Sequence, residues 1–129
     1  MPGDFEEIKG LVVEVDDVIY MPSLDAPPDR PHPFVYFINI RNGTAERITI
    51  IGRKWLVRED GNEEVMVVEG DGVVGQTPTI EPGDVFSYNS YHVARGTSFA
   101  EGAFFGRTES GQRVVTRIPR FTMSLPDWV

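Results

Sequence analysis

Alternating apolar residues between positions 34 and 57 constrain the fold more than any other part of the chain. Apolar side chains recur at every second position from Phe34 to Ile40, while Asn39 and Arg41 take the opposite face. Successive side chains of a β-strand point to opposite faces, whereas a helix repeats every 3.6 residues or so. The pattern therefore predicts a half-buried strand, and a second strand where the alternation restarts at Ile48.

A polar connection at residues 42–46 separates these two strands. It begins with Asn-Gly, and a connection of this length either closes a hairpin or carries the chain to a second sheet. We favour the crossing. Beyond it, Gly52 interrupts the alternation and shifts Arg53 and Trp55 onto one face, which predicts a bulge or bend at that point.

The segments around this centre also consist of short strands and turns. Leu11–Tyr20 reads as a strand whose Asp16-Asp17 pair predicts a bulge or an exposed edge. Residues 21–33 contain five prolines, which cannot donate backbone hydrogen bonds to a sheet, so they predict a surface loop. A tight turn at residues 60–62 sends residues 64–68 back antiparallel to the preceding strand.

The second half of the chain continues in the same way. Residues 70–82 form a loop punctuated by glycine and proline, and strands follow at 85–90, 99–107 and 112–118, with alternation resuming at 121–125. No stretch has helical periodicity. Roughly seven to nine short strands at this spacing predict an all-β protein, an antiparallel β-sandwich of two sheets, with a closed barrel as the alternative.

Length and composition narrow the class of protein. At 129 residues the chain fits one domain, and its lack of cysteine excludes disulfides and limits any zinc site to His32, His92 and carboxylates. The net charge of −8 repels phosphate backbones, which disfavours a nucleic acid partner. No apolar run approaches the roughly 20 residues that cross a bilayer, and the acidic N-terminus is unlike a signal peptide. We expect a soluble, cytoplasmic protein that makes no membrane contact.

A glycine motif offers one candidate binding site. Gly70, Gly72 and Gly75 match G-x-G-x-x-G, in which glycines let the start of a helix approach a pyrophosphate. A proline follows shortly after and no helical pattern comes next, which argues against a dinucleotide-binding fold. Backbone amides of such a loop can also bind anions without a helix. The alternative function is therefore a phosphate, pyrophosphate or nucleotide site assisted by Arg53 or Arg107, against a purely structural turn.

The sequence offers no catalytic constellation. His92 lies close in sequence to Ser90 and Ser98, but a catalytic Ser–His pair needs a third orienting group and an oxyanion site. Hydroxyl and imidazole groups are common in exposed loops for ordinary hydrogen-bonding reasons, so their closeness in sequence is weak evidence of catalysis. We therefore predict no catalytic residue and no enzyme activity.

The acidic residues offer no recognisable metal site. Asp16, Asp17, Glu69 and Asp71 are the carboxylates that could gather, but no spacing resembles a calcium loop. Paired acids more often form a solvated face. We predict no metal site and no cofactor.

Arg53, Lys54 and Trp55 place two cations beside an indole on the central segment. An exposed tryptophan between cations is typical of a binding hot spot, whereas an inward-facing one belongs to the core. Trp55 shares its face with Arg53 and Val57, a mixed face that leaves both alternatives open. Arg53 and Trp55 are the candidate partner-binding residues.

Four motifs in order, IRNGTAERITIIGRKWLV, VEGDGVVGQTPTIEPG, FSYNS and VTRIPRF, resemble the ApaG family, also called CorD. The resemblance runs from about Leu11 to Leu125. It implies a single domain over residues 1–129 with an immunoglobulin-like or fibronectin type III-like sandwich. Residues 1–10 would be an exposed N-terminal segment, 21–33 a proline-rich loop and 126–129 a C-terminal tail.

The resemblance also implies a function. The family occurs as a module of an F-box protein and of a polymerase-delta-interacting protein, which implies protein–protein interaction. Its bacterial members are linked to cobalt resistance and magnesium efflux, a role that must be indirect for a domain of this size. Many members have Arg-His-Trp where this chain has Arg53-Lys54-Trp55, so a histidine that could hold a metal is missing. We expect a protein partner of unknown identity, with a homo-oligomer left open.

Overall fold

A computed structural model describes residues 4–129, which contain nine β-strands and no α-helix. The strands are β1 (Glu6–Glu7), β2 (Leu11–Tyr20), β3 (His32–Asn42), β4 (Ile48–Glu59), β5 (Val65–Asp71), β6 (Thr79–Ile80), β7 (Val85–Ala94), β8 (Ser98–Thr108) and β9 (Arg113–Met123). No described segment forms a helix with the length and apolar character that a membrane crossing requires. Strand pairing alone therefore organises the described chain.

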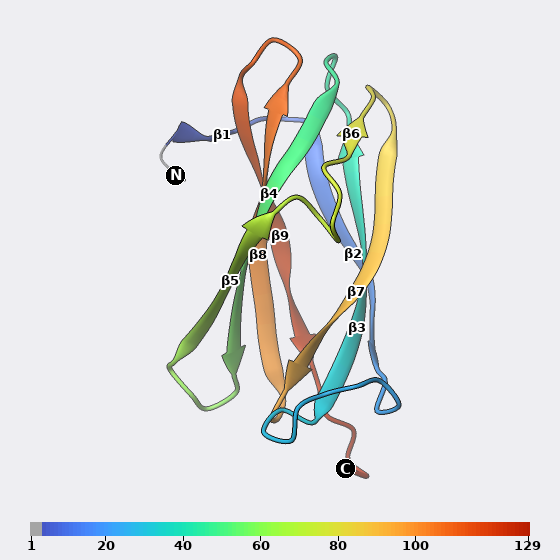
Figure 1. The fold of residues 1–129 in the computed structure, drawn as a ribbon, viewed down its shortest axis with the longest axis vertical. Helices are drawn as coiled ribbons and strands as arrows, with labels where there is room; N and C mark the ends of the chain where they lie inside the picture. The colour runs from blue at the N-terminus through green and yellow to red at the C-terminus, as the bar shows by residue number, and fades with distance from the viewer. Residues whose placement is uncertain (1–3) are drawn as a thin grey trace.

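Two sheets pack face to face (Figure 1). The six-stranded sheet, here sheet A, has the order β1-β9-β8-β4-β5, and β6 pairs with the start of β4. The three-stranded sheet, sheet B, has the order β2-β3-β7. Among the described strands every pair is antiparallel except β1 with β9. The prediction of an all-β sandwich is confirmed, and two separate sheets replace the alternative of a closed barrel.

The alternation along β3 builds the core. The alternating residues from Phe34 to Ile40 are at most 4% exposed and pack against sheet A. Tyr36, for example, contacts Trp55 of β4, with ring centroids 5.0 Å apart. Burying one side chain of this size stabilises the fold by about 1.5–3 kcal/mol relative to leaving it exposed. The predicted half-buried strand is therefore the centre of the core.

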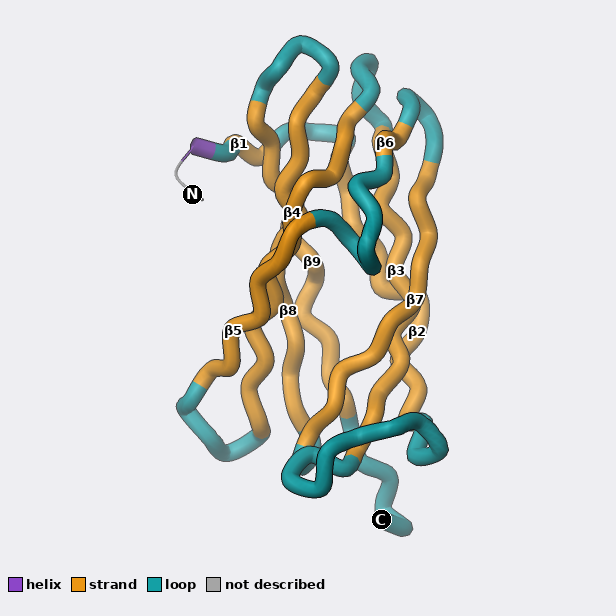
Figure 2. Tube along the Cα trace, in the orientation of Figure 1, coloured by secondary structure: helices purple, strands orange, loops and turns teal. Residues whose placement is uncertain are grey.

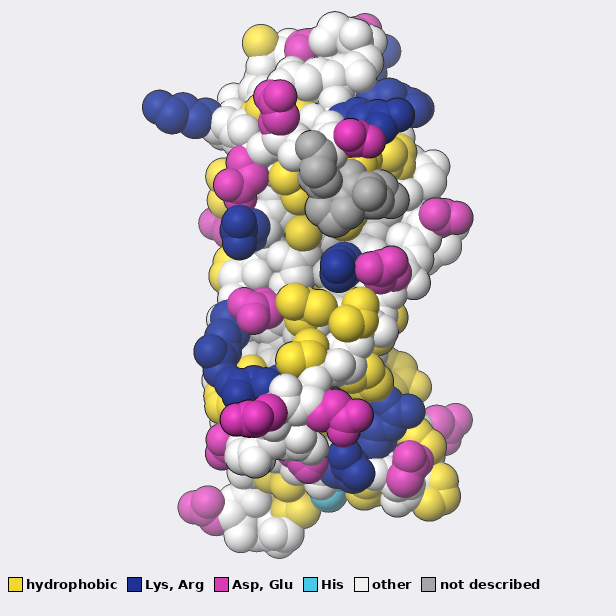
Figure 3. Space-filling model, turned by 90° about the vertical axis from the view of Figure 1, so that its left-hand side faces the viewer, with side chains coloured by type: hydrophobic (Ala, Val, Ile, Leu, Met, Phe, Trp, Pro, Cys, Tyr) yellow, Lys and Arg dark blue, Asp and Glu magenta, His cyan; other side chains and the backbone are white. Residues whose placement is uncertain are grey.

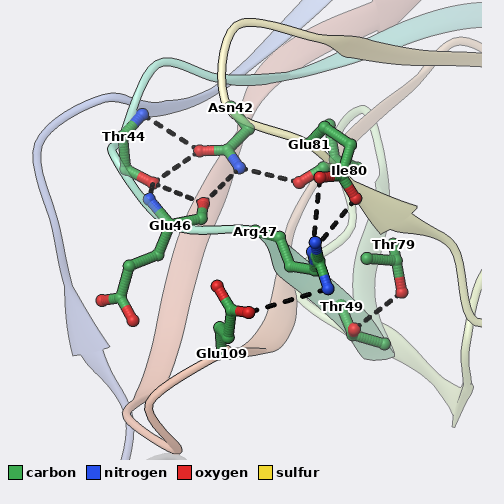
Figure 4. A network of polar contacts seen from close by, with 9 residues as sticks. All are labelled: Asn42, Thr44, Glu46, Arg47, Thr49, Thr79, Ile80, Glu81 and Glu109. Carbon is green, nitrogen blue, oxygen red and sulfur yellow. Dashed lines mark hydrogen bonds and ion pairs between the residues drawn. The ribbon is translucent and has the colours of Figure 1, made fainter.

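The connection between β3 and β4 crosses from sheet B to sheet A, as predicted. Asn42 holds it in place: the buried side chain donates from Nδ2 to the carbonyls of Glu46 at 2.7 Å and Ile80 at 2.8 Å (Figure 4). Its Oδ1 accepts a hydrogen bond from the amide of Thr44 at 3.0 Å. One buried side-chain amide thereby ties the crossing connection to β6.

The predicted irregularities are confirmed. The pairing of β4 with β8 shifts register between Ile50 and Gly52, which is the expected bulge. The pairing of β2 with β3 shifts between Val15 and Asp17, and β2 is also an edge of sheet B. Around residues 60–62 the chain forms the expected hairpin of β4 and β5.

The last strand differs from its prediction. β9 runs through Pro119 as one strand, although the pattern predicts separate pieces at 112–118 and 121–125. The register of β9 against β8 shifts in this region, and β9 lies near the edge of sheet A. The proline lacks an amide hydrogen, but at this position β9 has no regular strand pairing on both sides that the missing hydrogen bond could interrupt.

The described part of the N-terminal segment is attached to sheet A. Glu6–Glu7 adds a short parallel strand beside Val114 and Val115. Phe5 packs edge-on against Phe105 with ring centroids 5.1 Å apart. The segment predicted as exposed thus has exposed acidic side chains but an anchored backbone, and its residues 1–3 lie outside the described residues.

Candidate functional site

Trp55 belongs to the core. It is 2% exposed and contacts Tyr36 and His92, with ring centroids 5.0 Å and 4.7 Å away. The alternative that it forms an exposed binding platform is wrong, because sheet B covers the inner face of β4 at this point. Trp55 cannot contact a partner directly.

Arg53 lies two residues before Trp55, on the same face of β4, and binds the glycine loop. Its Nη1 donates to the carbonyls of Asp71 at 2.8 Å and Gly72 at 3.3 Å. A Cβ added to Gly70 would lie 2.8 Å from the same guanidinium. The structure therefore brings together Arg53 and the glycine motif, and a side chain at residue 70 would have to displace the flexible Arg53 guanidinium.

The other two glycines of the motif also have structural reasons. Val73 and Gln76 exchange backbone hydrogen bonds of 2.7 Å and 2.9 Å, which closes a two-residue turn. Gly75 lies in that turn with φ +79°, and a Cβ on Gly72 would lie 2.0 Å from the carbonyl oxygen of Gln76. The amides of Gly72, Val73 and Gln76 all donate to protein carbonyls. The motif is a tight turn whose amides are largely used within the fold.

Some residues of the predicted anion site nevertheless line one cavity, which has a volume of about 680 Å³. It lies by the face of sheet A that points away from sheet B and is lined by Gly70, Arg53 and Arg107, although the Arg53 guanidinium itself donates to the glycine loop from the inner face. Gly72 and Gly75 do not line it. Its other charged residues include two ion pairs, Arg113–Asp4 at 3.2 Å and Lys54–Glu69 at 3.5 Å.

His92 lies in β7, which continues past the predicted strand end at residue 90, and its ring faces the core. Its ring packs on Tyr36 and edge-on against Trp55, each with centroids 4.7 Å apart. Burial lowers the pKa of His92 to about 4, because the charged imidazolium loses its hydration in the core and is therefore disfavoured. Within residues 4–129 its Nε2 is the one buried side-chain nitrogen or oxygen without a hydrogen-bond partner.

The hydroxyl groups near His92 in sequence serve structural roles. Ser98 is buried in β8 and donates to the carbonyl of Gly96 at 3.0 Å. Ser90 hydrogen-bonds Tyr36, and burial raises the pKa of that tyrosine. His32 lies with Nδ1 2.9 Å from the hydroxyl of Tyr20. None of the hydrogen bonds among the described residues joins a serine to either histidine.

The candidate carboxylates are dispersed. Asp16 accepts a hydrogen bond from Asn39 at 2.6 Å on sheet B, whereas Glu69 and Asp71 lie on β5 of sheet A. The described residues contain no group of three or more histidine, cysteine or acidic side chains arranged to hold a metal ion.

The most unusual surface lies on β5, which sequence reasoning did not single out. β5 ends sheet A, and its four consecutive apolar residues, Val65 to Val68, are 37–52% exposed. Edge strands usually carry charged residues, proline or a bulge that prevents pairing with another chain. Viewed from the side on which β1 and β5 lie, the surface shows hydrophobic side chains between acidic and basic ones (Figure 3). The signal was the run of four apolar residues, but the sequence does not say which strand ends the sheet.

A groove separates β5 from β7, the edge of sheet B on the same side of the molecule. It contains a cavity of about 370 Å³ lined by Met66 and Val68 of β5 and by Tyr91 and His92 of β7. We call this the β5–β7 groove. The loop between β2 and β3 runs across the ends of β3 and β7 (Figure 2) and supplies Asp25, Pro27 and Arg30 to the lining of this cavity, with Arg30 Nη1 3.0 Å from the sulfur of Met66.

Fold and site together define an antiparallel β-sandwich domain with one open, apolar sheet edge beside a groove. Residues 22–107 match the family model described as DUF525, the ApaG domain. The chain therefore belongs to the ApaG family.

Individual proteins similar in sequence and in structure support this family assignment. The chain is 38% identical over 109 residues to Protein ApaG of Shewanella woodyi, covering 83% of this chain and 85% of that one. It is 35% identical over 94 residues to Protein ApaG of Chromobacterium violaceum, covering 72% and 74%. The crystal structure of the putative ApaA protein from Bordetella pertussis superposes with a TM-score of 0.79 and 29% identity over 95% of this chain and 98% of that one.

Proposed function

We propose that this protein is a non-catalytic protein-binding module that contacts its partner through the edge strand β5. The observation that carries the proposal is the row of four exposed apolar side chains on a strand with one unoccupied edge. Exposed apolar surface of this kind marks interaction sites in proteins. An unpaired strand edge also offers a row of backbone donors and acceptors to another chain.

The arrangement of titratable groups favours binding over catalysis. An acid–base site needs a titratable group that can exchange protons with a substrate. His92 packs on Tyr36 and Trp55 at the wall of the β5–β7 groove, and burial lowers its pKa to about 4, which makes it a weak base at neutral pH. Burial likewise raises the pKa of Tyr88, which keeps its hydroxyl protonated. These groups stabilise the core in their neutral forms.

The family's link to cobalt resistance and magnesium efflux fits this proposal only indirectly. We propose that any such role runs through the bound protein.

Site-specific photocrosslinking in cells tests the proposed surface. A photoreactive benzoylphenylalanine replaces Val67, the most exposed residue of the β5 row, at 52% exposure. The matched control places the same group at Val12, which is 48% exposed on the edge strand β2 of sheet B. We expect a crosslinked protein from the Val67 position and none of the same mass from Val12. Crosslinks that are identical at both positions, or absent from Val67, would reject the proposed surface.

A second candidate function is an anion site in the 680 Å³ cavity. It is favoured by one observation: Gly70, Arg53 and Arg107 line the same cavity. Replacing Gly72 is a poor test, because a Cβ there would collide with the carbonyl oxygen of Gln76 at 2.0 Å and disturb the turn.

Calorimetric titration with pyrophosphate tests this candidate without touching the turn. The variant is Arg107→Glu, which reverses an exposed charge of the cavity, and the matched control is Arg95→Glu, an exposed arginine that does not line it. The anion site requires heat that Arg107→Glu abolishes and Arg95→Glu retains. No heat at about 1 mM pyrophosphate would reject it, because a site with a Kd of about 1 mM, or about −4 kcal/mol, would be half occupied at that concentration.

A further inference from the structure

We propose that the occupant of the β5 edge is an extended segment of a protein partner, with apolar side chains at its centre and lysine or arginine at its ends. The segment adds to sheet A as one more strand and inserts every second side chain into the β5–β7 groove. This inference rests on the proposed function and specifies the chemistry of the partner. Four observations carry it: the length of the edge, its two faces, its flanking charges and the poor fit of a second copy.

The backbone of β5 is long enough to hold such a segment. β5 spans Val65–Asp71, and at about 3.4 Å per residue this row is on the order of 20 Å long. Its apolar stretch contains no proline and no bulge against β4, whose pairing with β5 is regular from Gly52 to Arg58. A regular edge presents evenly ordered donors and acceptors, which is what an added strand requires.

The two faces of β5 give the added strand different surroundings. Met66 and Val68 lie directly opposite Val57 and Trp55, so they share the inner face of sheet A. They line the 370 Å³ cavity together with His92, whose Nε2 has no partner among the described residues. This volume lies within the range of ligand pockets, about 300–1,000 Å³. Alternate side chains of the partner therefore enter the β5–β7 groove, and the others lie over the outer face.

The groove continues toward the start of β5. A second cavity of about 410 Å³ shares Met66, Val57 and Arg30 with the first. Its charged lining consists of Asp29, Glu59 and Glu64 together with Arg30 and Arg95. Glu59 is only partly neutralised, because its ion pair with Arg95 spans 3.6 Å at the surface. At this end a basic side chain of the partner would meet three carboxylates and two arginines, so the acidic groups are in slight excess.

Acidic residues at both ends of the apolar row give β5 a charge that is complementary to a segment with basic ends. Glu63 and Glu64 precede the row, and Glu69 and Asp71 follow it. Only Glu69 among these pairs with a cation, Lys54 at 3.5 Å, within the described residues. The chain as a whole carries −8. Complementary charge speeds association and fixes the register of a bound segment.

A second copy of this chain fits the edge poorly. If two β5 strands paired antiparallel with Val65 opposite Val68, Glu64 would face Glu69 at both ends of the row. Slipping the register by one residue in either direction would place Glu63 opposite Glu69 or Asp71. Like charges directly opposite each other destabilise a strand pair. The edge is therefore built for a different, basic chain.

Synthetic peptides test the proposal directly. The probe is a fluorescent peptide of about nine residues, enough to span β5, with alternating valine and threonine at its centre and two lysines at each end. Its control has the same centre with glutamates at the ends. Fluorescence anisotropy should show the lysine peptide binding at least about tenfold more tightly, with the difference shrinking in salt. Equal binding of the two peptides, or none by the lysine peptide, would overturn the inference.

Backbone methylation separates strand addition from side-chain docking. In an added strand every second amide points to β5 and the others point to solvent. Methylating one alternate set of peptide amides should abolish binding, and methylating the other set should preserve it. Tolerance of both sets would overturn the added-strand geometry.

Two protein variants complete the test. Val67→Lys introduces a charge of the partner's sign at the centre of β5 and should weaken the lysine peptide at least about tenfold, while Val12→Lys on the opposite edge should not. Thermal melts of both variants confirm that they fold. A wild-type dimer in sedimentation that Val67→Lys dissociates would show that a second copy is the occupant, and would overturn the inference.

The two proposals fail separately. Absence of crosslinking from Val67 rejects the proposed function. Crosslinking to a protein whose contact segment is acidic or helical leaves the proposed function standing and rejects only the basic extended segment.

Discussion

Val74 adopts a backbone conformation that β-branched residues avoid. It is the one non-glycine residue with positive φ in the described chain, at 44°, and it forms the tight turn with Gly75, whose φ is +79°. Two successive positive φ values define a turn that favours Asn-Gly, and a left-handed conformation costs other L-residues about 1–2 kcal/mol. The turn therefore keeps an exposed apolar side chain at the expense of stability.

Replacing Val74 should relieve this strain. We expect Val74→Asn to raise the free energy of unfolding in urea by about 1 kcal/mol, because asparagine tolerates the left-handed region. The matched control is Val85→Asn, an exposed valine in β7, where asparagine fits the extended backbone less well and no gain is expected. A loss of stability in Val74→Asn would mean that its side chain makes stabilising contacts that outweigh the strain.

His92 should make the stability of the fold pH-dependent. Burial lowers its pKa to about 4, below the value of about 6.5 in an unfolded chain, so the unfolded state binds more protons between these values. Its contribution is complete above about pH 6.5 and is lost as the pH falls toward 4, up to about 3 kcal/mol.

Urea unfolding of wild type and His92→Phe between pH 7 and 4 measures this contribution. Phenylalanine keeps the contacts with Tyr36 and Trp55 but cannot be charged. We expect the variant to lose less stability on acidification than the wild type. The same series on His32→Gln shows whether loss of the other histidine has the same effect. Parallel curves for wild type and His92→Phe would contradict the assignment.

The sequence predicts few of these residue-level properties. The local sequence around a histidine on a strand is the same whether the histidine faces solvent or the core. Its burial depends on whether the other sheet covers that face. The Gly70, Gly72 and Gly75 spacing alone occurs both in anion-binding loops and in tight turns, and the proline that follows argues only against the helix of a dinucleotide-binding fold. What distinguishes them is the carbonyl of Gln76, which the local turn brings against Gly72, and the guanidinium of Arg53, which strand pairing brings to Gly70.

At the scale of elements, the crossing between β3 and β4 depends on Asn42. Its buried side chain bonds the carbonyls of Glu46 and Ile80, and its own backbone bonds Asp84 and Gly83. Losing a buried hydrogen-bond donor leaves the carbonyls unsatisfied, at a cost of about 1–3 kcal/mol for each buried group. The same side chain therefore links three separate segments.

Asn42→Ala should lower the free energy of unfolding by about 3 kcal/mol, measured by urea denaturation. Arg47→Ala is the control on the same connection, because its ion pairs with Glu81 at 3.2 Å and Glu109 at 3.6 Å are exposed and worth about 0–1 kcal/mol. Equal effects of the two substitutions would show that the buried amide is not what holds the crossing.

The positions of strands along the chain can be predicted from local sequence patterns, whereas the order of strands within a sheet cannot. The alternation of β3, the interruption at Gly52 and the turn at residues 60–62 are local patterns, and each predicts the element that forms. The order of strands in a sheet is set by packing between segments that are distant in sequence. The exposure of Val65 to Val68 depends on that order, so the candidate binding edge could not be predicted, whereas the sandwich could.

At the scale of the whole molecule, protection of backbone amides should follow the order of the sheets. β4 and β8 each have a neighbour on both sides, whereas β5 and β2 end their sheets. Edge strands open locally more readily because half of their backbone groups face outward.

Hydrogen–deuterium exchange by mass spectrometry measures this protection. We expect peptides from β8 to exchange most slowly and peptides from β5 most quickly among the long strands of sheet A. Adding the lysine-flanked peptide should slow exchange in β5 and leave β2 unchanged. Slower exchange in free β5 than in β8 would contradict the described strand order.

The short parallel strand β1 has a consequence for stoichiometry. It covers β9 at Val114 and Val115, and Pro119 further along has no amide hydrogen to offer, so the far side of sheet A is a poor site for growth. A filament built by extending this sheet would need both of its sides to accept new strands. Sheet A offers only the β5 side, so copies of this chain cannot extend the sheet in both directions, and the complex should hold one partner segment for each copy of the chain.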